Sequence, residues 1–283
     1  MVFEDLIDPA NAESHPRAVF LHSVIYVSLG LFLGWWIFGE YASLVAVFLT
    51  TMAAIPLMHS IIRIEEKKDT VIGSEKNLLK EHSKALNVFM AYFIGATLTF
   101  AFWYIILPRD LSTAMFNVQE STLTALGVQV TGFTFADFNT FLSILANNLK
   151  VLLFCILFSF LYGAGAIFIL TWNASVIGSA IGVTILKGMA ELGLRLHENF
   201  SLNHLTVISY GLLRYTVHGI PEILAYFIAG LAGGIISVAA IRHDFRTKRY
   251  RQIITDASVL LLLSFIILVL AAFLEVYVTP VLF

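Results

Sequence analysis

Charged residues are scarce in this sequence, at 13% of its 283 residues. Soluble domains carry roughly a quarter of their residues as Asp, Glu, Lys and Arg, so this shortage argues against a soluble globular protein. Cysteine is rarer still: Cys155 is the only one, which excludes an intramolecular disulfide. With a net charge of −2, the chain has no overall basic character, and we expect no nucleic-acid partner.

Catalytic signatures are also missing. The sequence has no phosphate-binding loop, no dinucleotide-binding fingerprint, no nucleophile elbow and no His-Glu-x-x-His pair. These absences favour a protein that is not an enzyme and that carries no cofactor.

Apolar residues, in contrast, make up 59% of the chain. A bilayer core requires about 20 predominantly apolar residues per helix. Six clear runs meet this requirement, and a seventh at 174–194 is weaker because Lys187, Glu191 and several glycines interrupt it. The six clear runs are 18–38, 41–62, 86–107, 149–171, 221–241 and 254–278. The sequence therefore predicts an all-α, polytopic helical bundle that forms a single integral membrane domain over 1–283, multi-pass in the cell membrane.

The distribution of Lys and Arg predicts the topology, because basic loops stay in the cytoplasm. The two most basic connections are 64–85 and 242–252, and both should be cytoplasmic. Segment 108–147 contains only one basic residue, and we expect an amphipathic element on the outer face. An even number of spans between the basic connections gives seven spans with a cytoplasmic N-terminus. Alternatively, 174–217 forms two re-entrant half-helices, and the spans then number six.

Both basic connections have two interpretations. The connection 64–85 mixes acidic and basic residues, which is typical of a solvated helical connection. The second connection is more one-sided, and its charges either only set the topology or also bind anionic lipid headgroups. These charges are Arg242, Arg246, Lys248, Arg249 and Arg251.

Glycine pairs at a spacing of four place two glycines on one helix face, where two backbones can approach closely. The pairs are Gly30 with Gly34, Gly178 with Gly182, and Gly230 with Gly234. These faces serve either packing within the bundle or, for the stretch 225–237, a subunit interface that would make the protein a homo-oligomer.

Ionisable residues inside spans are costly and suggest a functional site. His218, Glu222 and Glu275 are the main candidates. Glu222 follows Pro221, so it is either an acid that favours the start of a helix or part of a polar intramembrane cluster with His218 and Glu275. Asn147 and Asn173 either cap helices or line the same cluster. The simplest interpretation of Lys187 and Glu191 is that they form an ion pair within one helix.

A metal site would have to use His218 and Glu222, if any residues here bind one. Zinc hydrolases on helices place two histidines one turn apart, and this stretch reads His-x-x-x-Glu with no second histidine in that turn. His197 and His204 lie upstream, which leaves a composite site open.

These residues resemble the stage II sporulation protein M family, a group of membrane proteins from bacteria and archaea. The resemblance covers roughly 145–283, with Val217 where the family usually has a proline. For sporulating bacteria, this resemblance implies a scaffold subunit that helps to assemble cell-wall-remodelling enzymes at a membrane. The residues that carry the resemblance are Asn147, Asn148, Asn173, Gly178, His218, Gly219, Glu222, Glu275 and Pro280.

Three functions remain as hypotheses from the sequence. The first is a non-catalytic scaffold or membrane subunit of a remodelling or transport assembly, with lipid and membrane or cell-envelope proteins as partners. The second is a secondary transporter or channel for an ion or small solute that uses the polar cluster. The third is an intramembrane metal-dependent hydrolase.

Overall fold

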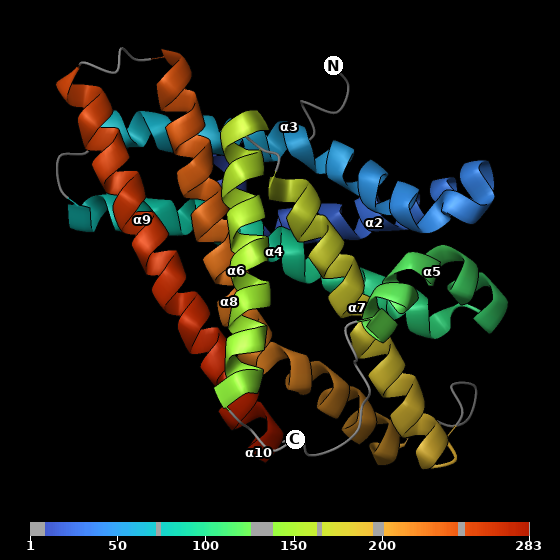
Figure 1. Cartoon of the computed structure of the whole chain (residues 1–283). Coiled ribbons are helices and arrows are strands. Elements are labelled where there is room, and N and C mark those ends of the chain that lie inside the picture. The colour runs from blue at the N-terminus through green and yellow to red at the C-terminus, as the bar shows by residue number, and fades with distance from the viewer. Residues whose placement is uncertain are drawn as a thin grey trace.

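The structure is a computed structural model that describes residues 9–71, 75–125, 138–162, 166–194, 201–242 and 247–282. These residues are almost entirely helical and contain no strand, which confirms the prediction of an all-α fold (Figure 1). The elements are α1 (Pro9–Ser14), α2 (Pro16–Phe38), η1 (Gly39–Tyr41), α3 (Ala42–Val71), α4 (Glu75–Ile106), α5 (Arg109–Ala125), α6 (Phe138–Tyr162), α7 (Ala166–Glu191), α8 (Leu202–Arg242), α9 (Lys248–Phe273), η2 (Leu274–Val278) and α10 (Thr279–Leu282).

Within the described residues, six helical stretches are long and apolar enough to cross a membrane, and the first of them contains α2 and most of α3. The chain is therefore a multi-pass membrane protein, as its composition predicts. The six stretches are Pro16–Glu65, Glu81–Ile106, Phe138–Ser159, Ala166–Glu191, Leu202–Ile241 and Tyr250–Leu282.

The predicted glycine faces pack helices together. A Cβ on Gly34 would lie 3.0 Å from the carbonyl oxygen of Ala42, where α2 and α3 form a hairpin. A Cβ on Gly178 would lie 2.7 Å from Cβ of Phe100, where α7 crosses α4. Only residues without side chains permit such close backbone approach, so these glycines fix the distance between neighbouring helices.

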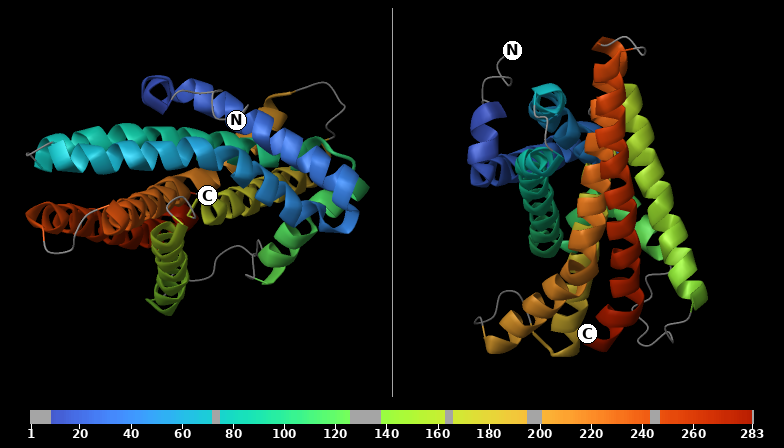
Figure 2. Two further views of the ribbon diagram at one scale, coloured as in Figure 1. Left: turned by 90° about the horizontal axis from the view of Figure 1, so that it is seen from above. Right: turned by 90° about the vertical axis from the view of Figure 1, so that its left-hand side faces the viewer.

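Helix α8 lies at the centre of the molecule, in contact with α3, α4, α6, α7 and α9. Its second half is the most deeply buried of the candidate spans, since 83% of the most apolar stretch of α8 is buried. Helices α2 and α6 lie on opposite sides of the molecule in both views of Figure 2. The other long helices are thus arranged around α8.

Helix α6 and the second half of α8 run in the same direction, from the bottom to the top of Figure 1. Gly230 of α8 faces Ser159 of α6, and a Cβ on Gly233 would lie 2.9 Å from the carbonyl oxygen of Ile156. Tyr226, one turn earlier on α8, interacts with Cys155, one turn earlier on α6. Gly234 is buried as well. Within the single chain, Gly230 and Gly233 of the 225–237 face thus pack against α6.

Two predicted helix boundaries are wrong. The run 149–171 is not one helix, because α6 ends at Tyr162 and α7 begins at Ala166. Residues 138–147, predicted as part of an outer segment, are the first turns of α6. The sequence stays apolar from α6 through 163–165 into α7, so no charged residue marks where α6 ends. Residues 174–191 complete the continuous helix α7, and 202–217 form the first half of α8.

Of the segment 108–147, the structure describes one further helix, α5, which changes direction at the non-helical residue Phe116. Residues 126–137 lie outside the described part of the chain. Helix α5 is joined to the end of α4, because the Tyr104 hydroxyl donates a 2.7 Å hydrogen bond to Glu120. Arg109 forms a 3.0 Å ion pair with the same carboxylate.

The prediction of a solvated connection at 64–85 is wrong for Glu65, which is fully buried. Lys68 Nζ and His82 Nδ1 each lie 2.6 Å from a different oxygen of its carboxylate. Lys68 also pairs with Glu13 at 3.0 Å, so the cluster joins α1, α3 and α4. Burial raises the pKa of Glu13 despite its ion pair, because the desolvation cost exceeds the attraction of Lys68.

Candidate functional site

Helix α8 changes direction along its length (Figure 1), and the predicted polar residues His218 and Glu222 flank Pro221, the proline inside this helix. Pro221 has no N–H to donate to the preceding turn, and its ring crowds that turn, so proline within a helix produces a bend. His218 and Glu222 are four residues apart and therefore share one face of α8. The sequence thus places two polar side chains on one side of a bent helix.

Glu222 is partly buried and is hydrogen-bonded within its own helix. The hydroxyl of Tyr226, whose side chain is fully buried, donates a 2.7 Å hydrogen bond to Oε1 of Glu222. A carboxylate removed from water needs such a donor to offset its lost hydration. Tyr226 is therefore a member of the site that the sequence analysis missed, although its spacing of one turn from Glu222 is a usable signal.

The C-terminal turns complete the site. The hydroxyl of Thr279 donates a 3.0 Å hydrogen bond to the carbonyl of Leu274, and Nδ1 of His218 lies 3.2 Å from the same hydroxyl oxygen. Because the threonine hydrogen points to Leu274, Nδ1 of His218 must carry the proton and donate it to Oγ1 of Thr279. This contact joins the bend of α8 to the end of the chain.

Glu275 lies in η2, a π-helical turn that continues α9. Such turns widen the helix by one residue and often occur at functional sites. The carboxyl group is partly buried and interacts electrostatically with Glu222. Within the described part of the chain it has no hydrogen bond. Glu222 and Glu275 thus lie near each other, and His218 contacts Thr279 in the C-terminal turns that follow Glu275.

The two asparagines of α6 face different ways. Asn147 is exposed, whereas Asn148 is buried, and its amide nitrogen has no hydrogen-bond partner among the described residues. The parallel register of α6 and α8 puts Asn148, two turns before Cys155, level with residues 219–222 of α8. Asn148 rather than Asn147 is therefore the asparagine of α6 that faces the packed side of the bundle near the site.

Asn173 bonds within its own helix, and the predicted ion pair between Lys187 and Glu191 does not occur in the described part of the chain. The amide of Asn173 donates a 2.8 Å hydrogen bond to the carbonyl of Ile169 on its own helix. Lys187 and Glu191 are exposed at the end of α7. In the basic patch, Lys248 and Arg251 are exposed, whereas Arg246 and the side chains of Arg242 and Arg249 lie outside the described part.

Lys150 is a feature that the sequence analysis did not single out. It is exposed and lies halfway along α6, and no ion pair to it occurs within the described part of the chain. Its position was hidden because the predicted span began at residue 149, which placed this lysine at a membrane boundary. The correct helix bounds put it among the exposed apolar residues Leu142, Leu153, Phe154 and Leu157.

No three His, Cys, Asp or Glu side chains in the described ranges are grouped so that they could hold a metal ion. His218 and Glu222 share a helix face, but His218 is engaged with Thr279 and Glu222 with Tyr226. The donor set therefore does not resemble that of a zinc hydrolase, which uses three protein ligands.

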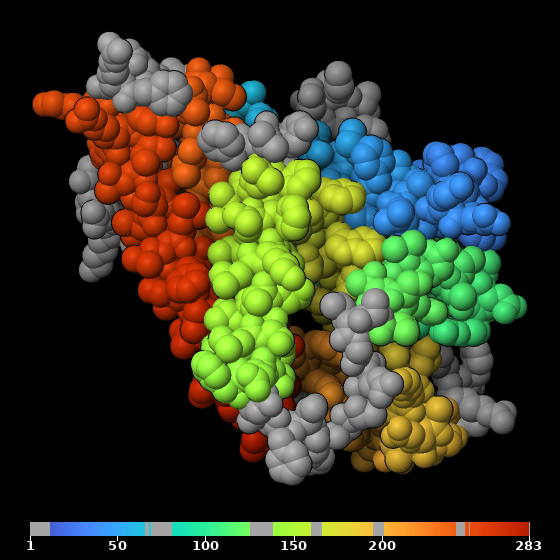
Figure 3. All heavy atoms as spheres, in the orientation of Figure 1, coloured from blue at the N-terminus to red at the C-terminus, as the bar shows by residue number. Residues whose placement is uncertain are grey.

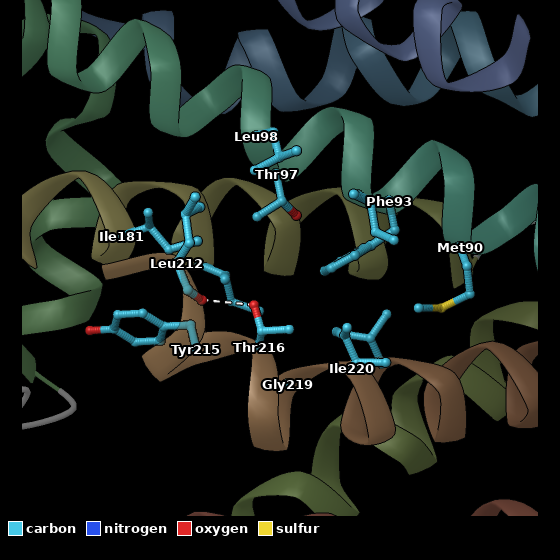
Figure 4. Close-up of a pocket in the computed structure, with 13 residues that line it drawn as sticks. Met90, Phe93, Thr97, Leu98, Ile181, Leu212, Tyr215, Thr216, Gly219 and Ile220 are labelled. Carbon is cyan, nitrogen blue, oxygen red and sulfur yellow. Dashed lines mark hydrogen bonds between the residues drawn. The ribbon is translucent and has the colours of Figure 1, made fainter. Parts of the chain in front are cut away.

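A cavity of about 250 Å³ lies elsewhere, between α4, α7 and the first half of α8 (Figure 4). Its lining is apolar apart from the hydroxyl groups of Thr97, Tyr215 and Thr216. Neither Glu222 nor Glu275 belongs to this lining. The cavity and the ionisable group thus lie on different faces of the bent helix.

Comparison with known proteins identifies relatives of this chain. The family model described as Stage II sporulation protein M matches residues 23–280, a wider range than the resemblance noted at 145–283. An uncharacterized protein of Methanocaldococcus jannaschii is 34% identical over 143 residues, which is 50% of this chain and 71% of that protein. No solved structure matches.

Proposed function

The chain belongs to the stage II sporulation protein M family, and from this premise we propose that it is a non-catalytic membrane subunit of a larger assembly. The subunit acts in the cell membrane as a scaffold, and it binds its partner through helix α6. Exposed Lys150, halfway along this helix, is the observation that carries the proposal.

A lysine in a membrane span is costly unless a counter-charge or water compensates for its lost hydration. Only 17% of the most apolar stretch of α6 is buried, which is less than in any other candidate span of the described residues. It stands on the surface of the molecule in Figure 3. Lys150 therefore faces outward from the bundle, and its compensating group must come from outside the described residues.

The surface around Lys150 defines the chemistry of the partner. Leu153, Phe154 and Leu157 follow it at helical spacing on the same exposed face. A second transmembrane helix with a carboxylate opposite Lys150 and small or apolar residues around it would fit this face. In lipid, such polar contacts between helices contribute about 0.6–2 kcal/mol each and give the association its specificity.

The ionisable group at the bend supports a scaffold rather than a transport pathway. His218 and Glu222 are both hydrogen-bonded within the bundle, and the sizeable cavity does not reach Glu222 or Glu275. These contacts hold the bend of α8 against the C-terminal turns and so keep the central helix in a fixed shape.

The scaffold crosses the membrane seven times, once each with α2, α3, α4, α6, α7, α8 and α9. In Figure 1 the α3–α4 ends and the α8–α9 ends lie on the same, upper-left side of the molecule. Both ends adjoin basic connections, so this side is cytoplasmic, as is the N-terminus. Lys248 and Arg251 are exposed there and bind anionic lipid headgroups.

The test is purification of the tagged full chain from its native membranes in a mild detergent, with quantitative mass spectrometry of the eluate. A scaffold should co-purify with one membrane or envelope polypeptide at a fixed ratio. The Lys150→Leu variant should lose this polypeptide, and Lys187→Leu, the same change at an exposed lysine near the end of α7, should retain it. A lone chain in every case contradicts the proposal, as does a partner that Lys150→Leu retains. A second copy of the chain as the only partner would replace the scaffold by a homo-oligomer.

A second candidate, a pathway for protons or another cation, is favoured by one observation. The Glu275 carboxylate lacks a hydrogen bond among the described residues, sits in a π-helical turn and lies near Glu222. If this candidate is correct, purified protein in liposomes should conduct protons or sodium ions, and Glu275→Gln should abolish the flux. Flux that is absent, or unchanged by Glu275→Gln, dismisses it.

A further inference from the structure

The apolar cavity beside the bent helix α8 is lined on its α8 side by a glycine, Gly219. In Figure 4, Gly219 and Ile220 of α8 lie below the space, and Phe93 and Thr97 of α4 lie above it. Ile181 of α7 closes one side. The cavity therefore occupies the junction of three membrane helices beside the bend at Pro221.

Gly219 differs from the packing glycines of the bundle. A Cβ on Gly178, Gly211 or Gly233 would approach a neighbouring atom to within 3 Å, so close helix packing explains those glycines. A Cβ on Gly219 would meet no atom within 4 Å, although this residue is buried. Its missing side chain brings no two helices together. It leaves the cavity open.

The lining is almost entirely apolar, and the buried Thr97 hydroxyl is the one lining hydroxyl without a hydrogen-bond partner among the described residues. No charged side chain contributes to it. The Thr216 hydroxyl donates to the carbonyl of Leu212 at 2.7 Å, and the Tyr215 hydroxyl is 3.2 Å from that of Thr184. A charged or strongly polar ligand would lose its hydration here, with only the single Thr97 hydroxyl to compensate.

The rim and the size identify the occupant. Ile94 and Ile220 line the cavity and are 37% and 43% exposed, so the space opens between residues that face lipid. A helix, about 10 Å in diameter, cannot enter a space of about 250 Å³, and drug-sized ligand pockets begin near 300 Å³. An unbranched chain can enter from the bilayer.

We propose that this cavity holds one hydrocarbon chain of a membrane lipid, which packs against the bend of α8. The chain fills the space that Gly219 leaves open and supports the helix where Pro221 removes a backbone hydrogen bond. This site lies on α4, α7 and α8, away from the outer face of α6, so it is independent of the scaffold proposal.

The experiment uses the full-length protein in phospholipid vesicles that contain a phospholipid with a photoreactive diazirine in its acyl chain. After irradiation, labelled peptides are mapped by mass spectrometry. Labelling should concentrate on the lining segments 90–98 and 212–220, above the level on the exposed face of α6. Gly219→Leu and Thr216→Phe, which fill the cavity from its floor and its rim, should each remove this excess. Leu213→Phe, an exposed change on α8 outside the lining, should leave it intact.

Two results overturn the inference. One is equal labelling of the lining and of the α6 surface in the wild-type protein. The other is excess labelling that persists in the filled variants. If Gly219→Leu fails to give folded protein by size-exclusion chromatography, Thr216→Phe alone decides, since residue 216 is exposed at the rim.

Discussion

The imidazole of His218 and the hydroxyl of Thr279 lie 3.2 Å apart, although 61 residues separate them in the sequence. This contact joins the bend in the central helix to the last helical turn of the chain. Because Thr279 also donates to Leu274, one hydroxyl both closes the π-helical turn and anchors it to α8. The position of Glu275 within that turn depends on this anchor.

Thr279→Val should therefore destabilise the protein by about 1 kcal/mol, since it removes a hydrogen bond between two segments at nearly constant volume. Thermal unfolding in detergent measures the effect. Thr206→Val is the matched control, because the Thr206 hydroxyl is exposed and bonds only to Leu202 on its own helix. An equal loss in both variants would show that the contact between His218 and Thr279 contributes nothing.

Tyr226→Phe should cost about 1–3 kcal/mol, because it leaves the carboxyl group of Glu222 without its donor. Adding Glu222→Leu to this variant should restore part of the loss, as both partners are then apolar. Tyr41→Phe, at a side chain that is 70% exposed, should be neutral. Chemical unfolding of wild type, Tyr226→Phe, Glu222→Leu, the double variant and Tyr41→Phe gives these values. Strict additivity of the substitutions at 222 and 226 would refute the interaction.

Alanine substitutions at two glycines should affect the melting temperature differently. Gly178→Ala forces a Cβ to within 2.8 Å of the carbonyl oxygen of Thr97, so it should separate α4 from α7 and lower the melting temperature. Gly219→Ala meets open space and should leave the melting temperature unchanged or raise it. A lower melting temperature for Gly219→Ala than for Gly178→Ala would contradict the packing described here.

Lys68 should make stability depend on alkaline pH. Burial alone would lower the pKa of Lys68, but its hydrogen bonds to Glu65 and Glu13 outweigh burial and raise it. A raised pKa means that the stabilisation is complete below the unfolded value of about 10.4 and is lost as pH rises through the folded value.

Lys68→Met should accordingly cost about 0.5–3 kcal/mol at neutral pH, between the values for exposed and fully buried pairs. The difference from wild type should shrink above pH 10.4 or so. Melting curves between neutral and strongly alkaline pH test this expectation. Lys84→Met removes an exposed pair with Glu81 and serves as the control; a difference for Lys68→Met that is constant with pH would be evidence against the cluster.

Much of the fold could be predicted because each helix of a membrane protein must satisfy its own backbone and present apolar side chains to lipid. The helix ends were harder. Apolar residues continue on both sides of 163–165, so hydropathy does not reveal where α6 ends. Proline at 221 suggested a helix start, but a long helix can retain proline as a bend, and α8 runs on from Leu202 to Arg242.

The site was predicted in part for a similar reason. The spacing of four residues predicts that His218 and Glu222 share a helix face, since four residues make about one turn. It cannot tell which of Asn147 and Asn148 faces the bundle, because that depends on how α6 is rotated against α8. The exposure of Lys150 likewise follows only from the true bounds of α6 and from its packing.

Site-specific photocrosslinking in native membranes tests the central claim most directly. A benzoyl-phenylalanine replaces Phe154, beside Lys150 on α6, or Phe265, which is similarly exposed on α9. The scaffold account predicts a covalent adduct with one other polypeptide from position 154, none from position 265, and loss of the adduct when Lys150→Leu is added. If position 154 crosslinks only to lipid, or crosslinks equally well without the lysine, α6 is not the docking helix and the account is wrong.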